Sequence, residues 1–283
     1  MVIVDFIFHF GLYKTASSLM QRKIFERRKY SRQISQCIRY SPKQWKQLDK
    51  TKLTEVFKDI YNSTQYKHYI HSNEQIYSAR IFLYQFLKRC QREPFRIATS
   101  IGNFAEYGWY YGKVKCLIFT RRQPEWMCSM YAQLSDRIDN PGQEDFEQRV
   151  ENLIREPDIY AAQCIMYDVL YSSLMNQNID TLILPYESVF EKETWDRVAD
   201  FTAINEVKNS QNLFFKNFKS DNQQGVVNQR RNGRYKWRLR YENREIQLTH
   251  EIEKKIWKFY HKSNQQLGQL TNSKKLLQTY EYF

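Results

Sequence analysis

Long apolar segments are missing from this sequence, which has no run of about 18 apolar residues, the length that a membrane-spanning helix needs. Its five cysteines include no CxxC pair and no metal-like spacing to histidine, so neither a zinc site nor a disulfide framework is indicated. Internal repeats and RNA-binding signature motifs are also absent. We therefore expect no transmembrane segment, and buried thiols in a reducing compartment.

The length and charge of the chain indicate how many domains it forms and which kind of partner it binds. With 283 residues the chain can bury a substantial core, and we expect one domain over residues 1–283. Lys and Arg outnumber Asp and Glu by 44 to 31, a net charge of +13. This balance favours an anionic partner: a nucleotide, a sulfated or phosphorylated glycan, nucleic acid or an acidic membrane surface.

Strand-like and helix-like patterns alternate along the chain. Nearly continuous apolar runs predict strands at residues 2–10, at about residues 113–119 and within "NIDTLILPYES", and "YKHYIHSNEQ" predicts a shorter one. Helical spacing or capping signals follow the first strand and recur later, near Ser41, Phe82–Leu87, Pro124, Ile159–Leu174 and Ile252–Tyr260. This alternation predicts an α/β fold with a mostly parallel central sheet flanked by helices.

The polar segment at about residues 209–241 stands apart from this pattern. It is rich in Asn, Gln and Arg, and "NQRRNGRYKWRLRY" carries most of its positive charge. We expect a long basic loop here, which covers a nucleotide, binds an anionic acceptor or forms a solvated face. A C-terminal helix then packs back on the domain.

The first turn of the sheet combines groups that suit an anion. Gly11 ends the first strand, and donors follow it directly: Lys14, Thr15, Ser17 and Ser18. A tight turn, a helix amino-terminus and these donors would form a phosphate cradle. The alternative is an ordinary turn, with Ser17 or Ser18 as N-cap and Lys14 in solvent. The GxxxxGK[ST] loop is not met, which disfavours a kinase or NTPase.

A second predicted strand-turn-helix segment also carries side chains that suit an anion. In "CLIFTRRQPEWMCSMYAQ", Arg121 closes a strand and Ser129 lies eight residues later, about two turns into the predicted helix. Both side chains could therefore approach one phosphate. Taken alone, the segment also fits a solvated arginine pair and a helix-surface serine. In a parallel sheet, both turns would lie at the carboxyl ends of the strands, where ligands bind.

Both turns resemble motifs of one enzyme family. "FHFGLYKTASSLMQ" resembles the 5′-phosphosulfate loop of sulfotransferases that use 3′-phosphoadenosine 5′-phosphosulfate (PAPS), and "FTRRQPEWMCSMYAQ" resembles their 3′-phosphate motif. Between the two motifs, "YIHSNEQIYSA" is similar to the strand-end segment where bacterial and carbohydrate sulfotransferases carry an acidic residue, and "LILPYESV" is similar to their later strand and its Tyr-Glu turn. The resemblance covers segments from residue 2 to about residue 190. It implies a three-layer, P-loop-like sulfotransferase fold.

The resemblance implies roles for individual residues. Lys14 would stabilise charge on the leaving phosphate, and Arg121 with Ser129 would bind the 3′-phosphate. The 5′-phosphosulfate would be held by the rest of the first turn: Gly11, Thr15, Ala16, Ser17 and Ser18. Ala16 stands where many members have glycine. Arg230 and Arg231 offer a loose equivalent of the loop that covers the nucleotide, and no metal is required.

The general base is the least constrained role. We expect Glu74, because it closes the second strand candidate near the shared strand ends and could accept a proton from an acceptor hydroxyl. His68 and His71 are rivals for this role, although a lone strand histidine is more often packed or solvated. His9, inside the first strand, is expected to be structural.

The reaction implied is transfer of a sulfuryl group from PAPS to a hydroxyl or amine, with a carbohydrate or glycoconjugate as the favoured acceptor. A cytoplasmic enzyme, in peripheral contact with a membrane when it reaches a glycolipid, fits the lack of targeting signals. The alternative is a non-catalytic basic protein that binds a nucleotide or nucleic acid. A degenerate sulfotransferase fold that binds without turnover is a third hypothesis. The acceptor itself cannot be identified from the sequence.

Overall fold

The computed structural model describes residues 4–11, 20, 34–37, 55, 58, 68–72, 101–102, 105–106, 112–158, 160–212, 229–231, 234–240 and 243–283. Two compact units make up the chain: unit 1 contains Met1–Ser78, Phe95–Thr120 and Tyr171–Phe215, and unit 2 contains the remainder. The single domain expected over residues 1–283 stays a prediction, because compactness alone does not show whether the units fold separately.

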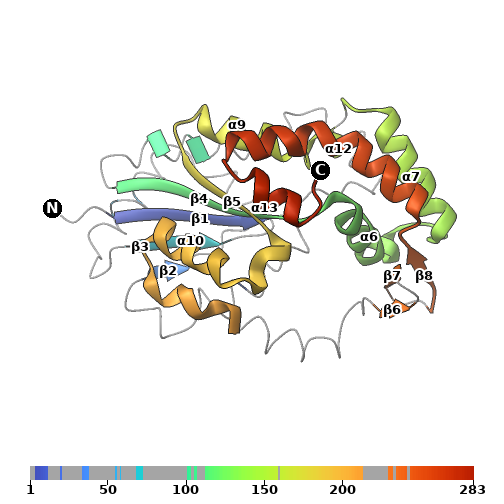
Figure 1. The fold of residues 1–283 in the computed structure, drawn as a ribbon, viewed down its shortest axis with the longest axis horizontal. Helices are drawn as coiled ribbons and strands as arrows, with labels where there is room; N and C mark the ends of the chain where they lie inside the picture. The colour runs from blue at the N-terminus through green and yellow to red at the C-terminus, as the bar shows by residue number, and fades with distance from the viewer. Residues whose placement is uncertain are drawn as a thin grey trace. The chain divides into compact units, whose positions relative to one another are not determined.

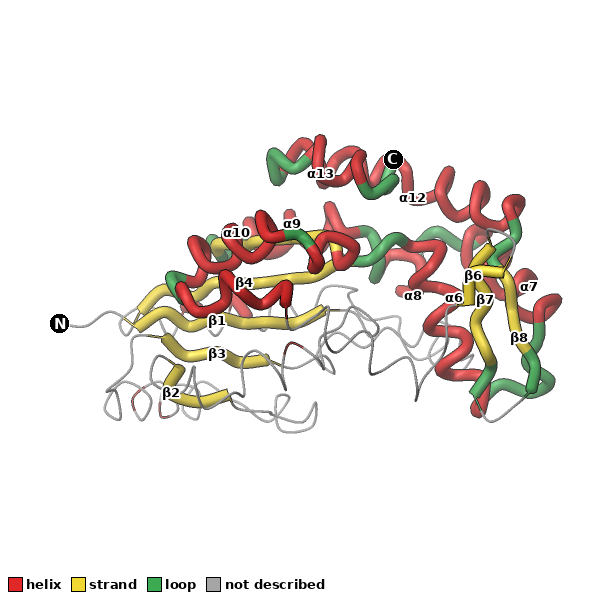
Figure 2. The backbone as a smooth tube through the Cα atoms, turned by 60° about the horizontal axis from the view of Figure 1, so that its bottom comes forward, coloured by secondary structure: helices red, strands yellow, loops and turns green. Residues whose placement is uncertain are grey.

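Unit 1 contains a five-stranded sheet in the order β2-β3-β1-β4-β5, and every neighbouring pair is parallel (Figures 1 and 2). The strands are β1 (Val4–Gly11), β2 (Ile34–Cys37), β3 (His68–Ser72), β4 (Gly112–Thr120) and β5 (Asp180–Pro185). The α/β class with a parallel sheet is therefore confirmed. Four of the strands match predicted runs, and β2 is an additional strand.

The central strands are buried on both faces, which explains their apolar sequences. Phe6 and Ile7, whose side chains alternate between the faces of β1, are both fully buried. Leu117 and Ile118 of β4 are likewise buried. A strand covered on both sides needs apolar residues at every position, so the continuous runs were the reliable signal.

Helix α10 (Lys192–Thr202) packs on this sheet within unit 1, after the short 3₁₀ segment η4 (Tyr186–Phe190). Its fully buried Trp195 lies against Phe119 of β4, with ring centroids 6.2 Å apart. Lys115 of β4 donates a hydrogen bond to the carbonyl of Phe201 (3.1 Å) and pairs with Asp5 (3.0 Å). This ammonium group therefore ties the last turn of α10 to two strands and complements the negative end of the helix dipole.

Unit 2 is mainly helical. Its described helices are α6 (Gln123–Leu134), η3 (Ser135–Arg137), α7 (Gln143–Arg155), α8 (Tyr160–Gln163), α12 (His250–Leu270) and α13 (Lys274–Thr279). Helix α9 (Tyr167–Met175) has residues in both units, and η5 (Asn205–Asn209) belongs to unit 1. Proline lies in the first turn of α6, as its sequence predicts.

The single helix predicted from Ile159 to Leu174 is wrong, because the structure has the separate helices α8 and α9 there. The chain turns between them, where Met166 N–H donates to the Gln163 carbonyl. Cys164 and Ile165 in this turn are fully buried. Apolar residues thus continue through the break, and apolar spacing alone could not reveal it.

The long loop predicted over residues 209–241 also needs correction. The described part of this segment contains β6 (Gln229–Arg231) and β7 (Arg234–Arg238), which form an antiparallel sheet with β8 (Glu245–Gln247). In β7 the fully buried Trp237 lies between Lys236 and Arg238, and this alternation is the period-two pattern of a half-buried strand. The abundance of arginine conceals that pattern.

The closing helix predicted near Ile252–Tyr260 is α12. Thr249 caps it by accepting a hydrogen bond from Ile252 N–H, and Ile252, Ile256 and Tyr260 are buried. Trp257 lies in the same predicted segment but is not buried, because 37% of its surface is exposed.

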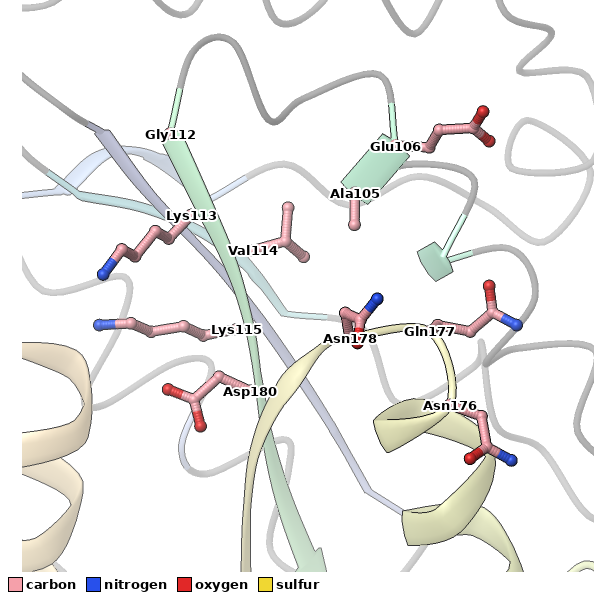
Figure 3. Close-up of a pocket in the computed structure, with 10 residues that line it drawn as sticks. All are labelled: Ala105, Glu106, Gly112, Lys113, Val114, Lys115, Asn176, Gln177, Asn178 and Asp180. Atoms are coloured by element: carbon pink, nitrogen blue, oxygen red, sulfur yellow. The ribbon is translucent and has the colours of Figure 1, made fainter.

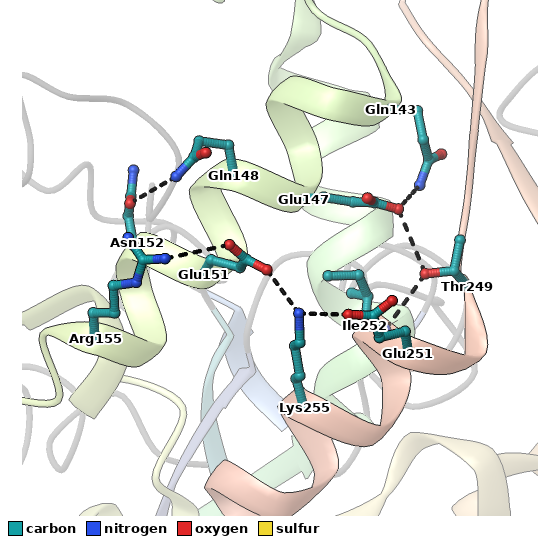
Figure 4. Close-up of polar contacts among 10 residues, drawn as sticks. All are labelled: Gln143, Glu147, Gln148, Glu151, Asn152, Arg155, Thr249, Glu251, Ile252 and Lys255. Carbon is teal, nitrogen blue, oxygen red and sulfur yellow. Dashed lines mark hydrogen bonds and ion pairs between the residues drawn. The ribbon is translucent and has the colours of Figure 1, made fainter.

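An ion pair joins α12 to α7 along their contact (Figure 4). Lys255 of α12 lies 2.7 Å from Glu151 of α7 and 2.8 Å from Glu251 of its own helix. The hydrogen bond and charge of Lys255 lower the pKa of the Glu151 carboxyl below its ordinary value of 4.5. Because the pKa is lower in the folded protein, ionised Glu151 stabilises the fold above its ordinary pKa, and this contribution disappears as the pH falls through the lowered value.

We expect Glu151→Gln to lower the thermal unfolding midpoint at neutral pH and to have progressively less effect below pH 4.5, the ordinary value for glutamate. Gln148→Ala is a matched control, because Gln148 bonds Asn152 on the same helix without a titrating group. Thermal unfolding of both variants across this pH range tests the expectation. An effect of Glu151→Gln that stays constant with pH would contradict it.

Candidate functional site

The carboxyl ends of β1 and β4 lie side by side in unit 1. Gly11, the last residue of β1, is in register with Phe119 of β4. The strands that follow β1 in the chain, β2 and β3, lie on one side of β1 in the sheet. The strand that follows β4, β5, lies on the opposite side of the pair formed by β1 and β4. The strand order therefore reverses between β1 and β4. In open parallel sheets, ligands bind outside the carboxyl ends of the strands at such a reversal.

Both predicted phosphate motifs follow these two strand ends in the chain. The first begins at Gly11, and its remaining predicted residues lie outside the described part of the structure: Lys14, Thr15, Ala16, Ser17 and Ser18. The second begins with Arg121, directly after Thr120 at the end of β4. The topology thus agrees with the sequence-based expectation that both motifs start at one edge of the sheet.

Arg121 and Ser129 meet within unit 2. The Nη1 group of Arg121 donates to Ser129 Oγ at 3.4 Å, a long and therefore weak hydrogen bond. Ser129 is only 5% exposed, one and a half turns into α6. Arg121 precedes α6 and Ser129 lies in its second turn, so the pair offers a fork of donors and an additional donor near the positive end of the helix dipole, features that attract an anion.

The backbone of Arg121 is fixed by the hydroxyl of Tyr167, a residue within the segment Ile159–Leu174 that the sequence predicts to be helical. This hydroxyl donates to the Arg121 carbonyl at 2.7 Å and accepts from the Arg121 N–H at 3.4 Å. The Tyr167 side chain is 1% exposed, so its position is set by the core. It therefore positions the residue that begins the second motif.

We expect Tyr167→Phe to weaken binding of 3′-phosphoadenosine 5′-phosphate (PAP) about 2- to 10-fold, the loss of one net hydrogen bond of about 0.5–1.5 kcal/mol. The ring remains, so the fold should persist, and a titration of the nucleotide measures the effect. Tyr171→Phe on the same helix is the control. Equal losses in both variants would contradict a positioning role for Tyr167.

The neighbouring arginine has a different role. Arg122 pairs with three carboxylates, at 3.0 Å from Glu125, 3.2 Å from Glu253 and 2.9 Å from Glu281. These partners lie on α6, on α12 and just after α13. Arg122 therefore links three segments of unit 2. This difference between two adjacent arginines is invisible in the sequence, because the three glutamates are dispersed along it.

A buried amide pair fixes the start of α6. The side chains of Gln123 and Asn264 exchange two hydrogen bonds, at 2.9 and 3.0 Å, and each is 2% exposed. Gln123 also donates to the Ile165 carbonyl, and Asn264 donates to the carbonyl of Tyr282. Buried amides that satisfy each other in this way stabilise one arrangement of α6 and α12.

The histidines of the sheet can be placed on its strands. His9 is 1% exposed, and burial lowers its pKa to about 3, so it is neutral at physiological pH. His68 and His71, the rivals for the role of base, lie on β3 in register with Asp5 and Phe8. Glu74, the expected base, lies outside the described residues. The identity of the base therefore stays a prediction.

Arg230 and Arg231, the predicted nucleotide-covering pair, lie on β6 at an edge of the three-stranded sheet. Arg230 is in register with Tyr235 and Arg231 with Arg234. They are therefore on a strand and not within a loop, and their contact with a nucleotide stays a prediction.

A pocket of about 640 Å³ opens in unit 1 (Figure 3). It is lined by the first residues of β4, by the turn before β5 and by two residues of a preceding segment: Gly112, Lys113, Val114, Lys115, Asn176, Gln177, Asn178, Asp180, Ala105 and Glu106. These are the amino ends of β4 and β5. The pocket is therefore at the opposite end of the sheet from Gly11 of β1 and Thr120 of β4.

Within the described residues, no cluster of three or more His, Cys, Asp or Glu side chains could hold a metal ion. None of the helices in the described part of the chain is both long and apolar enough to cross a membrane. No protein-family model matches this sequence, and no curated protein matches it.

Proposed function

We propose that this protein is a PAPS-dependent sulfotransferase with a carbohydrate or glycoconjugate acceptor. The observation that supports it most is the reversal of strand order between β1 and β4. Gly11 and Phe119 are in register there, and the chain continues from the two strands into the two motifs that resemble the phosphosulfate loop and the 3′-phosphate motif. A parallel sheet with the order 2-3-1-4-5 is compatible with the proposed P-loop-like fold.

The second motif has the chemistry that the proposed donor needs. PAPS carries a phosphate on its 3′-oxygen, and adenosine phosphosulfate does not. Arg121 and Ser129, 3.4 Å apart, together offer a guanidinium fork and a hydroxyl. An Arg fork bonds phosphate through two parallel donors, so it would both hold the nucleotide and distinguish it from one that lacks this group.

In the proposed reaction, the bond from sulfur to the bridging oxygen of the 5′-phosphate breaks, and a bond from sulfur to the acceptor oxygen forms. Negative charge accumulates on the leaving phosphate, where Lys14 would stabilise it. The acceptor hydroxyl loses its proton to a base, for which Glu74 is the leading candidate. The products are PAP and a sulfate ester. Holding both reactants in line would supply much of the rate enhancement.

The proposal is tested by incubating the purified protein with ³⁵S-labelled PAPS and a panel of oligosaccharides, glycolipids and small alcohols. We expect label to enter one acceptor class, with one PAP formed for each sulfate transferred. Binding of PAP without any transfer would favour a degenerate, non-catalytic fold. Absence of both transfer and PAP binding in a folded protein would overturn the proposal.

A further inference from the structure

The outward face of α12 is mainly basic and aromatic, and its exposed acidic residue, Glu251, is paired with Lys255. Its apolar face is used in unit 2, where Ile252, Ile256, Tyr260 and Leu267 are buried. The opposite face presents residues at helical spacing: Lys254, Trp257, Lys258, His261, Lys262, Gln265, Gln266 and Gln269. We call these eight residues the α12 outer face. Its composition is not needed for packing, because the core side of the helix is already complete.

Three lysines form a row along this face. Lys254, Lys258 and Lys262 are four residues apart, so their Cα atoms follow each other at about 6 Å along the helix axis. All three are exposed, and none forms an ion pair with a residue that the structure describes. Lys255, on the side toward α7, instead pairs with two glutamates. The row is therefore a line of positive charge in which Lys254 and Lys258 have no ion-pair partner among the described residues, and a polyanion would complement it.

Two carboxylates, Glu251 and Asp168, are near the row, and both are already engaged: Glu251 pairs with Lys255. Asp168 of α9 interacts electrostatically with Lys262. Its side chain is buried and accepts a hydrogen bond from Ser263. Asp168 does not replace an external anion, since Lys254 and Lys258 form no ion pair with any residue in the described part of the chain.

An indole ring is held in place within this row. Trp257 is 37% exposed and lies against His261, with ring centroids 4.3 Å apart. His261 in turn meets Phe283 edge to face at 6.2 Å. Because these contacts limit the motion of the indole, stacking of a ligand on its exposed part would cost less conformational entropy.

The chemistry of the face favours a sugar chain over other polyanions. A membrane-binding helix inserts an apolar face, and the apolar face of α12 is buried in the protein. The α12 outer face contains no arginine, the side chain that best combines phosphate bonding with base stacking in nucleic-acid sites. Its three glutamines, Gln265, Gln266 and Gln269, offer amides that can both donate to and accept from hydroxyl groups.

We propose that the α12 outer face binds an anionic glycan chain: the three lysines pair with its charged groups, Trp257 stacks on a sugar ring and the glutamines bond its hydroxyls. The choice of a glycan rests on the proposed function, since a carbohydrate sulfotransferase must hold a sugar acceptor. The surface would thus hold an acceptor chain that already carries negative charge.

The full chain tests this proposal through its affinity for dextran sulfate, with uncharged dextran, a single-stranded oligonucleotide and phosphatidylserine vesicles as comparison probes. The test variant is Lys254→Ala/Lys258→Ala/Lys262→Ala. The matched control removes the same charge from three separate exposed lysines, Lys58→Ala/Lys113→Ala/Lys192→Ala. We expect at least a tenfold loss of affinity in the first variant and less than a threefold loss in the second.

Two further readouts separate charge from stacking. The slope of log affinity against log salt should decrease in the triple lysine variant, because fewer counterions are displaced. Trp257→Ala should weaken binding severalfold without changing that slope, and Trp257→Phe should restore part of the loss. An unchanged affinity in both α12 variants would overturn the proposal.

Other outcomes would reject the glycan as the partner of the α12 outer face. Equal losses in the two triple variants would mean non-specific attraction, and tighter, α12-dependent binding of the oligonucleotide or the vesicles would replace the glycan with that partner. PAP binding is measured on the same proteins. If dextran sulfate binds through α12 but PAP does not bind at all, the proposed function fails while the anion-binding face stands.

Discussion

Replacing Lys14 with alanine is expected to slow sulfuryl transfer by about 10²- to 10³-fold, the usual loss when one preorganised group that stabilises transition-state charge is removed. The proposed role of Lys14 is to neutralise charge on the leaving phosphate, and this charge exists fully only as the bond to sulfur breaks. The rate should therefore fall more than the affinity for the donor. Single-turnover formation of PAP from PAPS measures the rate, and titration with PAP measures the affinity.

Lys14→Arg is the matched control for Lys14→Ala. It preserves the positive charge but changes its shape, so it should retain part of the rate. Thermal unfolding of all three proteins identifies a loss due to misfolding. A Lys14→Ala protein with a near-normal rate, or one that loses affinity and rate equally, would contradict the proposed role.

Replacing Arg121 with alanine is expected to weaken PAP binding by more than tenfold, about 1.4 kcal/mol or more. The variant should bind adenosine 5′-phosphate as the wild type does, because that nucleotide lacks the 3′-phosphate with which Arg121 would pair. The affinity of Arg121→Lys for PAP should fall between those of the wild type and of Arg121→Ala, since a single ammonium group replaces the guanidinium fork. Isothermal titration with both nucleotides provides the measurement.

Arg122→Ala is the neighbouring control for Arg121→Ala. Its side chain pairs with Glu125, Glu253 and Glu281, so its loss leaves three carboxylates without a shared cation. We expect a lower unfolding midpoint and little change in PAP affinity where the protein remains folded. The reverse pattern, with Arg122 needed for PAP and Arg121 dispensable, would contradict the assignment of the 3′-phosphate site.

The sheet was predictable because its strands are buried on both faces. Continuous apolar runs such as "CLIFT" need no knowledge of distant partners, and they place β1, β4 and β5 correctly. The four-residue β2 is too short and too polar to give such a run. Helices α7 and α10 are absent from the predicted elements, although Phe146, Val150 and Leu153 of α7 follow the i, i+4, i+7 spacing of an amphipathic helix.

The candidate site was predictable only in part, because a local sequence pattern cannot reveal contacts between residues that are far apart in the chain. The eight-residue spacing of Arg121 and Ser129 predicts that they can approach each other, since local helix geometry sets that distance. The contact between Tyr167 and Arg121 spans 46 residues, and that between Gln123 and Asn264 spans 141. Such pairs follow from tertiary packing, which no local pattern encodes. The positions of Lys14 and Glu74 stay predictions.

The most direct test of the proposed donor site is isothermal titration of the wild-type protein with PAP, compared with adenosine 5′-phosphate. The account predicts that PAP binds at least tenfold more tightly, because the extra phosphate would meet Arg121 and Ser129. No binding of PAP to a folded protein, or equal affinity for the two nucleotides, would contradict the assignment of this protein as a PAPS-dependent sulfotransferase.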